Sequence, residues 1–161
     1  SPHMSKTLIG SHQDLVELAS SIPEAGLAVS SSVLVDSERI IAFANATGDH
    51  QWIHVDFERA RTGPFGKTIA HGYLTLSLAP ALLFELIEPG NEGIVIMNYG
   101  LNKVRFPSPV PSGSEVSMKL IKVDVTSLDE QSSEGVFTLV LYVEGDAKPA
   151  CVMEAVYRFY W

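Results

Sequence analysis

The stretch "IAHGYLTLSLAPALLFELI", residues 69–87, is nearly apolar over nineteen residues and decides how the chain can fold. His71, Pro80 and Glu85 interrupt it, whereas a helix that spans a membrane needs about 20 clean apolar residues. We therefore expect no membrane span. The stretch instead predicts one long helix, from about Gly72 to Ile87, that is buried on all sides in a soluble core.

The sequence after this helix changes to a strand-like pattern. Runs rich in β-branched and aromatic residues occupy residues 94–106, 115–128, 135–145 and 149–161, with turn residues between them. One apolar helix followed by several antiparallel strands favours an α+β fold. A sheet curled around the helix would bury most of its surface, and a second subunit would cover the rest.

The residues before the apolar stretch predict shorter elements with recognisable ends. Ser11 is placed to cap a first helix, Gly48 ends a second one, and Asp56 caps a short third one. The stretch "GLAVSSSVLVD" between the first two is strand-like. No linker or repeat divides the chain, so residues 4–161 are expected to form a single domain, and residues 1–3 read as the remnant of an expression tag.

Charge and cysteine content exclude several functional classes. The chain of 161 residues has 11 Lys and Arg against 19 Asp and Glu, a net charge of −8. A nucleic-acid partner is not expected, because it would require a basic surface. The single cysteine, Cys151, fits a reducing compartment and a core position, and no signal peptide follows Met4. These features favour a cytoplasmic protein.

The stretch "ATGDHQWIHVD", residues 46–56, concentrates groups that could carry out chemistry. Asp49 and His54 can meet only if a tight loop joins them, and they would then form a general acid/base pair. Spacing alone leaves an unreactive polar loop as the simpler interpretation. A metal site at His50 and His54 would need a continuous helix, which Gly48 opposes, so no metal is predicted.

A third candidate lies where the apolar helix begins, at His71 and Gly72. The first amides of a helix have no partner within it, and a glycine allows a ligand to approach closely. A carbonyl oxygen that gains charge could be stabilised there. Considered alone, Gly72 is better explained by a sharp turn into the helix.

Taken together, these segments resemble one enzyme family. "FANATGDHQWIHVDFERA", residues 43–60, is similar to the signature of the MaoC-like, (R)-specific enoyl-CoA hydratases. The resemblance continues through "GPFGKTIAHGYLTLSL" and "NYGLNKVRFPSPVPSGSEV", and the most similar subgroup is the NodN-like hydratases. It therefore covers most of the chain after residue 35.

The resemblance implies a hot-dog fold, in which an antiparallel sheet wraps around one long helix, usually in a homodimer. It implies reversible hydration of a trans-2-enoyl-CoA to a (R)-3-hydroxyacyl-CoA without a metal or other cofactor. Asp49 and His54 match the pair that holds and activates water, and Gly72 matches the residue whose N–H polarises the thioester carbonyl. Many members have Asn-Pro at Gln51-Trp52, and some have a serine at Pro80, so the shape of the pocket is expected to differ here.

Further residues are weaker candidates for contacts with the substrate. Gln51, Trp52 and His71 flank the matched positions, and Lys103 and Arg105 share one face of a strand, where they could meet the phosphates of coenzyme A or simply face solvent. Ser77 and Thr75 are expected to bond their own backbone. Two other functions stay open: a hot-dog acyl-CoA thioesterase, and a protein that binds acyl thioesters without turnover.

Overall fold

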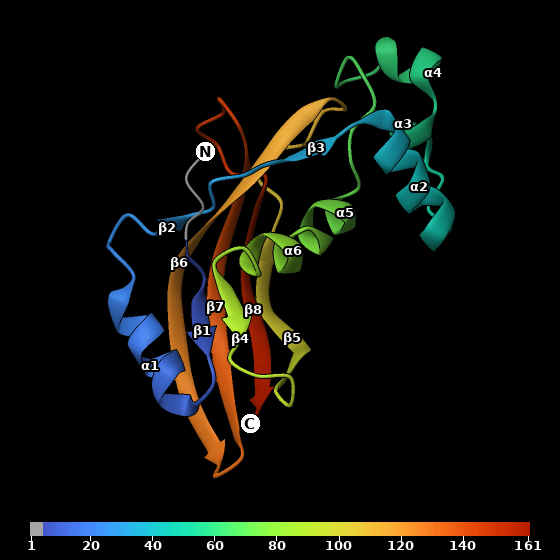
Figure 1. Cartoon of the computed structure of the whole chain (residues 1–161). Coiled ribbons are helices and arrows are strands. Elements are labelled where there is room, and N and C mark those ends of the chain that lie inside the picture. The colour runs from blue at the N-terminus through green and yellow to red at the C-terminus, as the bar shows by residue number, and fades with distance from the viewer. Residues whose placement is uncertain (1–4) are drawn as a thin grey trace.

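The computed structural model describes residues 5–161, and the expected tag remnant at residues 1–3 lies outside them. Four long antiparallel strands run side by side in the order β6-β7-β8-β5, and two short strands, β2 and β3, extend the sheet beyond β6 (Figure 1). The strands are β1 Thr7–Ile9, β2 Leu27–Ala28, β3 Val33–Val35, β4 Ile87–Pro89, β5 Val95–Arg105, β6 Ser114–Asp129, β7 Ser132–Val143 and β8 Cys151–Tyr160. Helices α5 and α6 lie across one face of this sheet, which confirms the α+β, hot-dog prediction.

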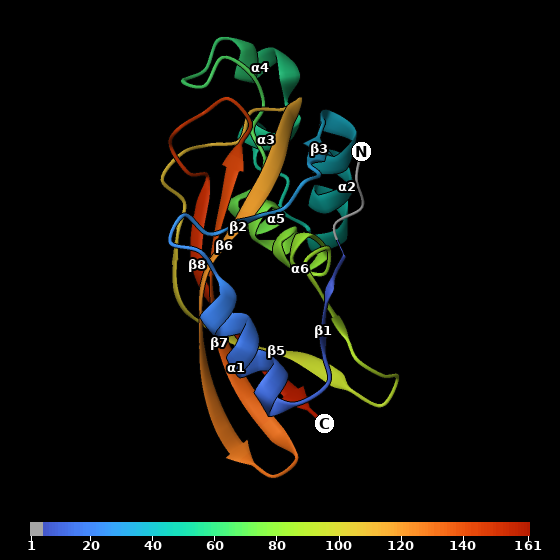
Figure 2. The same cartoon turned by 60° about the vertical axis from the view of Figure 1, so that its left-hand side comes forward.

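The helices are α1 His12–Ser21, α2 Ser37–Thr47, α3 Trp52–Val55, α4 Phe57–Arg61, α5 Gly72–Ser77 and α6 Ala79–Leu83. Helix α1 lies toward one end of the sheet, and α2, α3 and α4 gather beyond the other end (Figure 2). The predicted caps are confirmed: the Ser11 hydroxyl accepts a hydrogen bond from the Asp14 N–H, and the Asp56 carboxylate accepts one from the Arg59 N–H.

The core forms where the alternating strands meet the apolar helices. In β7 the side chains of Phe137, Leu139 and Leu141 are fully buried, and the residues between them are partly exposed. This period of two is that of a strand with one face on the core. From the helices, Leu74 and Leu82 pack into the same cluster. Cys151 is also fully buried, as expected, and its burial raises the pKa of the thiol to about 11.

The long apolar helix is shorter than predicted and is broken. It consists of α5 and α6, separated at Leu78, and the chain has become strand β4 by Ile87. Pro80 explains the break, because it has no N–H to donate to the carbonyl four residues earlier and is tolerated only in the first turn of a new helix. None of the helices in residues 5–161 is both long and apolar enough to span a membrane.

The prediction that this helix is buried on all sides is also wrong. Tyr73 is 71% exposed, and Ser77 and Ala81, one and two turns further on, are exposed as well. The sheet covers one side of α5 and α6, and no element of residues 5–161 covers the other.

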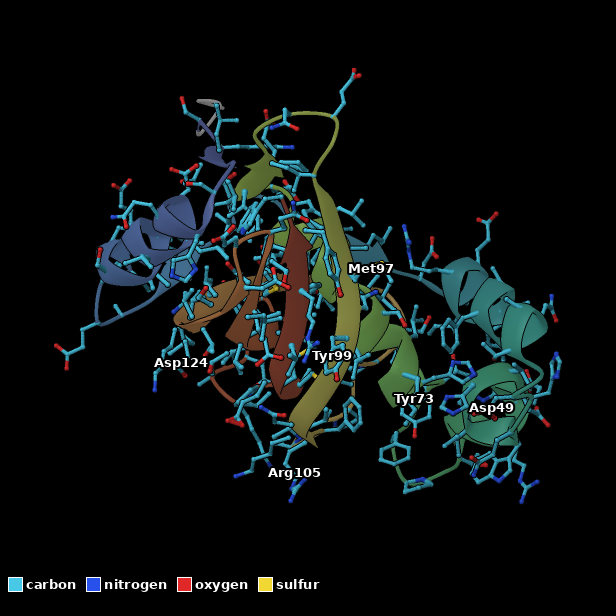
Figure 3. The ribbon with its side chains drawn as sticks, turned by 90° about the horizontal axis from the view of Figure 1, so that it is seen from below. Asp49, Tyr73, Met97, Tyr99, Arg105 and Asp124 are labelled. Carbon is cyan, nitrogen blue, oxygen red and sulfur yellow. The ribbon has the colours of Figure 1, made fainter. Side chains whose placement is uncertain are left out.

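Strand β5 forms an open edge beside this exposed side. In the described part of the chain it pairs only with β8, and its apolar side chains Val95, Met97, Tyr99 and Leu101 are each about half exposed. Met97, Tyr99 and Arg105 follow one another along β5, with Tyr73 of α5 next to the strand (Figure 3). An unpaired apolar edge of this kind is a surface on which another chain can add.

The chain also contains a pairing that the sequence pattern did not predict. β1 and β4 form a small parallel sheet in which Thr7 lies opposite Ile87. This pairing fastens the N-terminal segment to the chain that leaves α6.

Candidate active site

Asp49 owes its position to the end of α2. Gly48 adopts the left-handed conformation, with a φ of 85°, and its N–H donates to the Ala44 carbonyl at 2.8 Å. This stops the helix, because a side chain is rarely tolerated there. Asp49 follows directly, is exposed, and accepts a hydrogen bond from the Gln51 N–H at 3.3 Å.

His54 lies on the single helical turn α3, where a tight loop was predicted. It is buried, and its Nδ1 is 2.7 Å from the carbonyl oxygen of Ile69. Since a carbonyl can only accept, Nδ1 carries the proton, and Nε2 of the neutral ring is left as an acceptor. The Ile69 N–H donates in turn to the Ile53 carbonyl at 3.0 Å, so two segments hold this ring.

Burial lowers the pKa of His54 below its ordinary value of 6.5, because the charged ring loses hydration. The bond to the Ile69 carbonyl opposes this shift, His71 adds to it, and the carboxylate of Asp49 opposes it weakly. The outcome favours a neutral ring at neutral pH. A neutral imidazole with a free Nε2 is the form that can accept a proton.

His71 lies in the same group, in a position that the sequence did not reveal. It precedes α5 and is 3% exposed, and its ring stacks on that of His54 with 3.8 Å between centroids and 20° between planes. Its Nε2 lies 2.9 Å from the carbonyl oxygen of Asp49. The sequence spacing did not indicate this contact, because the two histidines are seventeen positions apart and no helical or strand periodicity relates them.

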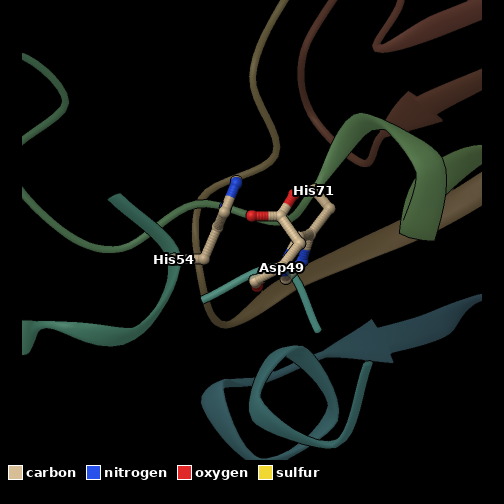
Figure 4. A group of neighbouring side chains, drawn as sticks. All are labelled: Asp49, His54 and His71. Carbon is tan, nitrogen blue, oxygen red and sulfur yellow. The ribbon is translucent and has the colours of Figure 1, made fainter. Parts of the chain in front are cut away.

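Three side chains from three separate segments therefore converge (Figure 4). A carboxylate oxygen of Asp49 and one ring nitrogen from each of His54 and His71 lie within 4.8 Å of one another. We call this group the reaction centre. His50 is not part of it, because its ring bonds the side chain of Asn45 at 3.0 Å and faces solvent.

The geometry of the reaction centre does not suit a metal ion. A ligating imidazole nitrogen points its lone pair along the ring plane, toward an ion about 2 Å away. The planes of His54 and His71 are stacked and nearly parallel, so they do not meet at a point close to both rings. One nitrogen of each ring is also held by a backbone carbonyl. The arrangement suits a hydrogen-bonded water better than an ion.

A cavity of about 410 Å³ opens next to these groups, and Gly72 forms part of its wall. A side chain at Gly72 would place its Cβ 3.3 Å from the ring of Phe106, so only glycine leaves this corner open. Thr75, expected only to bond its own backbone, also lines the cavity. The remaining walls come from Ile53, His54, Phe65, Ile69, Ala70, Ser108, Pro109, Val110 and Ala150.

A second cavity, of about 350 Å³, lies further along the same helices, between them and the strands β5 and β8. Its walls are mainly apolar, and they include Leu76, Pro80, Tyr99 and Met153. Pro80 therefore faces a cavity rather than the packed core. Ser77 also lines it, although its hydroxyl bonds the Tyr73 carbonyl at 2.7 Å, which confirms the expected backbone bond.

The other candidate residues lie outside both cavities. Gln51 is exposed, and the Trp52 ring lies under the guanidinium of Arg59, at 4.1 Å. Lys103 and Arg105 are exposed near the end of β5, and Arg105 donates to the Val104 carbonyl at 2.7 Å. Of these four residues, Gln51 contacts the reaction centre through its backbone N–H, which donates to the Asp49 carboxylate, and Arg105 immediately precedes Phe106, which lines the first cavity.

Comparisons with known proteins agree with this architecture. Residues 19–144 match the family described as MaoC like domain. The chain is 50% identical over 127 residues to 3-hydroxyacyl-thioester dehydratase Z of Mycobacterium tuberculosis, which covers 79% of this chain and 83% of the relative. It is 40% identical over 119 residues to nodulation protein N of Rhizobium leguminosarum bv. viciae, covering 73% of this chain and 74% of the relative.

Among solved structures, the (R)-hydratase from A. caviae superposes with a TM-score of 0.62 at 29% identity, over 86% of this chain and 98% of that one. Sequence similarity and fold thus agree over most of the length of the chain and of its relatives. The chain belongs to the MaoC-like dehydratase family.

Proposed function

We propose that the protein catalyses the reversible hydration of a trans-2-enoyl-CoA to a (R)-3-hydroxyacyl-CoA. The observation that carries this proposal is the convergence of the Asp49 carboxylate and the His54 imidazole within 4.8 Å, with Nε2 of His54 free to accept a proton. Two relatives, named 3-hydroxyacyl-thioester dehydratase Z and (R)-specific enoyl-CoA hydratase, support this reaction as the one that the pair would catalyse.

The reaction has three requirements. The oxygen of a water molecule must form a bond to C3, one proton of that water must be accepted as it attacks, and a proton must be delivered to C2. Asp49 and His54 share these two proton transfers around one water, so that no net proton is gained or lost. Because the two groups interact, they titrate as one unit, and neither is assigned alone as acid or base.

Attack at C3 moves charge onto the thioester oxygen, which then needs a donor. The N–H of Gly72 is that donor in our proposal, since it is the first amide of α5 and belongs to the wall of the cavity next to His54. The absence of a side chain lets the thioester approach this N–H closely. The reaction is a proton transfer and an addition, so it needs no metal or redox cofactor.

Each of the two cavities would bind a different part of the substrate. The first would hold the reacting thioester, and the apolar second cavity would take the acyl chain, with Pro80 limiting its shape. Lys103 and Arg105 stand at the end of β5, next to Phe106 of the first cavity, where cations can meet the phosphates of coenzyme A. Gln51 and Trp52 would form the outer rim, beside the reaction centre.

We propose that the active form of the protein is a homodimer and that it is located in the cytoplasm. Its support is the apolar row on β5, represented by Met97, Tyr99 and Leu101, which lies next to exposed Tyr73 of α5. A second copy of the chain would cover both. Light scattering that showed a stable monomer at micromolar concentration would contradict this part.

The direct test is an absorbance assay that follows loss of the enoyl thioester across a series of acyl chain lengths. We expect loss of the double bond without release of free thiol, and a (R)-3-hydroxyacyl-CoA as product. Thiol release would instead indicate a thioesterase. Tight binding of the thioester without turnover would indicate a non-catalytic binding protein.

A further inference from the structure

The sequence suggested His71 only as a weak candidate for contact with the substrate, and the proposed reaction gives it no task. Its environment is unusual for such a residue, because its ring packs against two other rings and one of its nitrogens contacts the main chain of Asp49. One face stacks on His54 at 3.8 Å, and Phe43 lies 5.0 Å away, tilted by 54°. Its Nε2 contacts the main chain of Asp49 at 2.9 Å. One side chain thus contacts both residues of the proposed acid/base pair, the ring of His54 and the main chain of Asp49.

The hydrogen bond to the main chain identifies which nitrogen carries the proton in the neutral form of this ring. The carbonyl of Asp49 can only accept, so Nε2 of His71 carries the proton and Nδ1 of the neutral ring is a bare acceptor. Among the side chains of residues 5–161, this Nδ1 is the one buried nitrogen or oxygen that has no hydrogen-bond partner. A buried polar atom without a partner is costly, and in native proteins it often belongs to a functional site.

His71 is also held more firmly than a loop residue would be. Its own carbonyl accepts from Leu74 and Thr75 at 3.1 and 3.2 Å, which anchors it to the first turn of α5. Just before it, the Ala70 N–H donates to the Val110 carbonyl at 2.8 Å. The ring of His71 therefore projects from a fixed backbone. A residue can hold other side chains in position only if its own backbone is fixed in this way.

We propose that His71 is a positioning residue of the reaction centre, which holds Asp49 through the hydrogen bond from Nε2 and holds His54 through ring stacking. This inference rests on the proposed hydratase function. It divides the role of His71 into two contacts, and each of them can be removed while the other is kept.

Two substitutions separate the contacts. His71→Gln places an amide N–H close to the position of Nε2 and keeps the bond to the Asp49 carbonyl, but it removes the ring. His71→Phe keeps a ring against His54 and removes both nitrogens. His50→Gln is the matched control, because His50 is an exposed histidine directly after Asp49, and its ring bonds the side chain of Asn45.

In His71→Phe, kcat should fall about tenfold, since the carbonyl of Asp49 loses its donor and Asp49 loses an anchor. The acid limb of the pH profile should shift less than in His71→Gln, because the phenyl ring keeps the face of His54 covered and only the electrostatic effect of His71 is lost. In His71→Gln, kcat on the pH plateau should stay within about threefold of the wild type, since the anchoring bond remains. Its acid limb should move to higher pH.

The direction of that shift follows from the groups around His54, which are the Ile69 carbonyl, His71 and Asp49. Burial is the main cause that lowers the pKa of His54. Removing the ring of His71 admits water to one face of His54, so its pKa rises toward the ordinary value. Nuclear magnetic resonance titration of the His54 imidazole measures the same shift without substrate.

The enzyme assay uses crotonyl-CoA, and thermal unfolding is measured for every variant. The proposal is supported if His71→Phe mainly loses kcat and His71→Gln mainly shifts the acid limb of its pH profile, while His50→Gln stays near the wild type. It is overturned if both variants keep the wild-type kcat and His54 titration, or if both simply fail to fold, which would make His71 a structural residue.

Asp49→Asn, assayed in parallel, separates this inference from the proposed function. If Asp49→Asn keeps its activity, the proposed function fails. If Asp49→Asn is inactive while both His71 variants titrate and react as the wild type does, only the role of His71 fails.

Discussion

In the reaction centre, one chain supplies the carboxylate, both imidazoles and the backbone carbonyls that orient the rings. At the β5 edge, the same chain leaves Val95, Met97, Tyr99 and Leu101 about half exposed and pairs the strand on one side only. In our proposal, one chain therefore supplies all the catalytic groups, whereas a second copy would be needed to cover the β5 edge. Changes in the two regions should therefore have different consequences.

The largest effect is expected from His54→Ala. Loss of the imidazole should lower kcat for enoyl-CoA hydration by about 10²–10⁴, the usual contribution of a positioned acid or base. Combining it with Asp49→Asn should lower kcat little further, because groups that act as a unit are not additive. Light scattering should show an unchanged assembly for both. If the losses multiplied, the two groups would act independently.

Met97→Glu should affect the β5 edge instead. A charge in the middle of the apolar row would have to be desolvated between two copies, so the protein should become monomeric in light scattering. Leu128→Glu is the control, since Leu128 is a similarly exposed apolar residue near the end of β6, away from β5. If Met97→Glu remained a dimer, the partner surface would have to lie elsewhere.

Gly72→Ala tests how closely the thioester must approach the first amide of α5. The new methyl group would lie 3.3 Å from the Phe106 ring, which is partly exposed and can shift, so folding should be retained. Crowding of the donor should lower kcat/KM by about tenfold, the order expected when one stabilising hydrogen bond is weakened. Wild-type kcat/KM together with a normal unfolding temperature would exclude Gly72 as the donor.

The smallest effect concerns pH. Because burial lowers the pKa of His54, the acid limb of kcat/KM should lie below pH 6.5. The free energy of unfolding should also decline as pH falls through this region, since His54 binds its proton more readily in the unfolded chain. A limb well above pH 6.5 would mean that the ring is stabilised in its charged form.

Local chemistry explains which parts of the fold could be predicted from the sequence. The caps at Ser11 and Asp56 and the stop at Gly48 depend on bonds within a few residues, so the sequence around them is sufficient. The alternation of β7 was visible for the same reason. Whether Pro80 would kink one helix or separate two helices depends on tertiary packing. A local sequence pattern does not contain that information, so the break between α5 and α6 could not be predicted.

Contacts between distant segments could not be predicted in this way. The parallel pairing of β1 with β4 joins Thr7 to Ile87, and the stacking of His71 on His54 joins a helix start to a separate turn. The motif around Asp49 and His54 indicated a pair through its resemblance to a family. It carried no sign that a third side chain contacts both residues, because that contact depends on how α5 enters the sheet.

The measurement that tests the central claim most directly is the rate of crotonyl-CoA hydration by Asp49→Asn. Asp49 is exposed, and the amide keeps its size, so the unfolding temperature should not change. We predict that kcat falls by about 10²–10⁴ relative to the wild type and to His50→Gln. If Asp49→Asn folds normally and keeps most of its hydratase activity, the acid/base assignment is wrong, and residues 48–54 form a polar loop without a catalytic role.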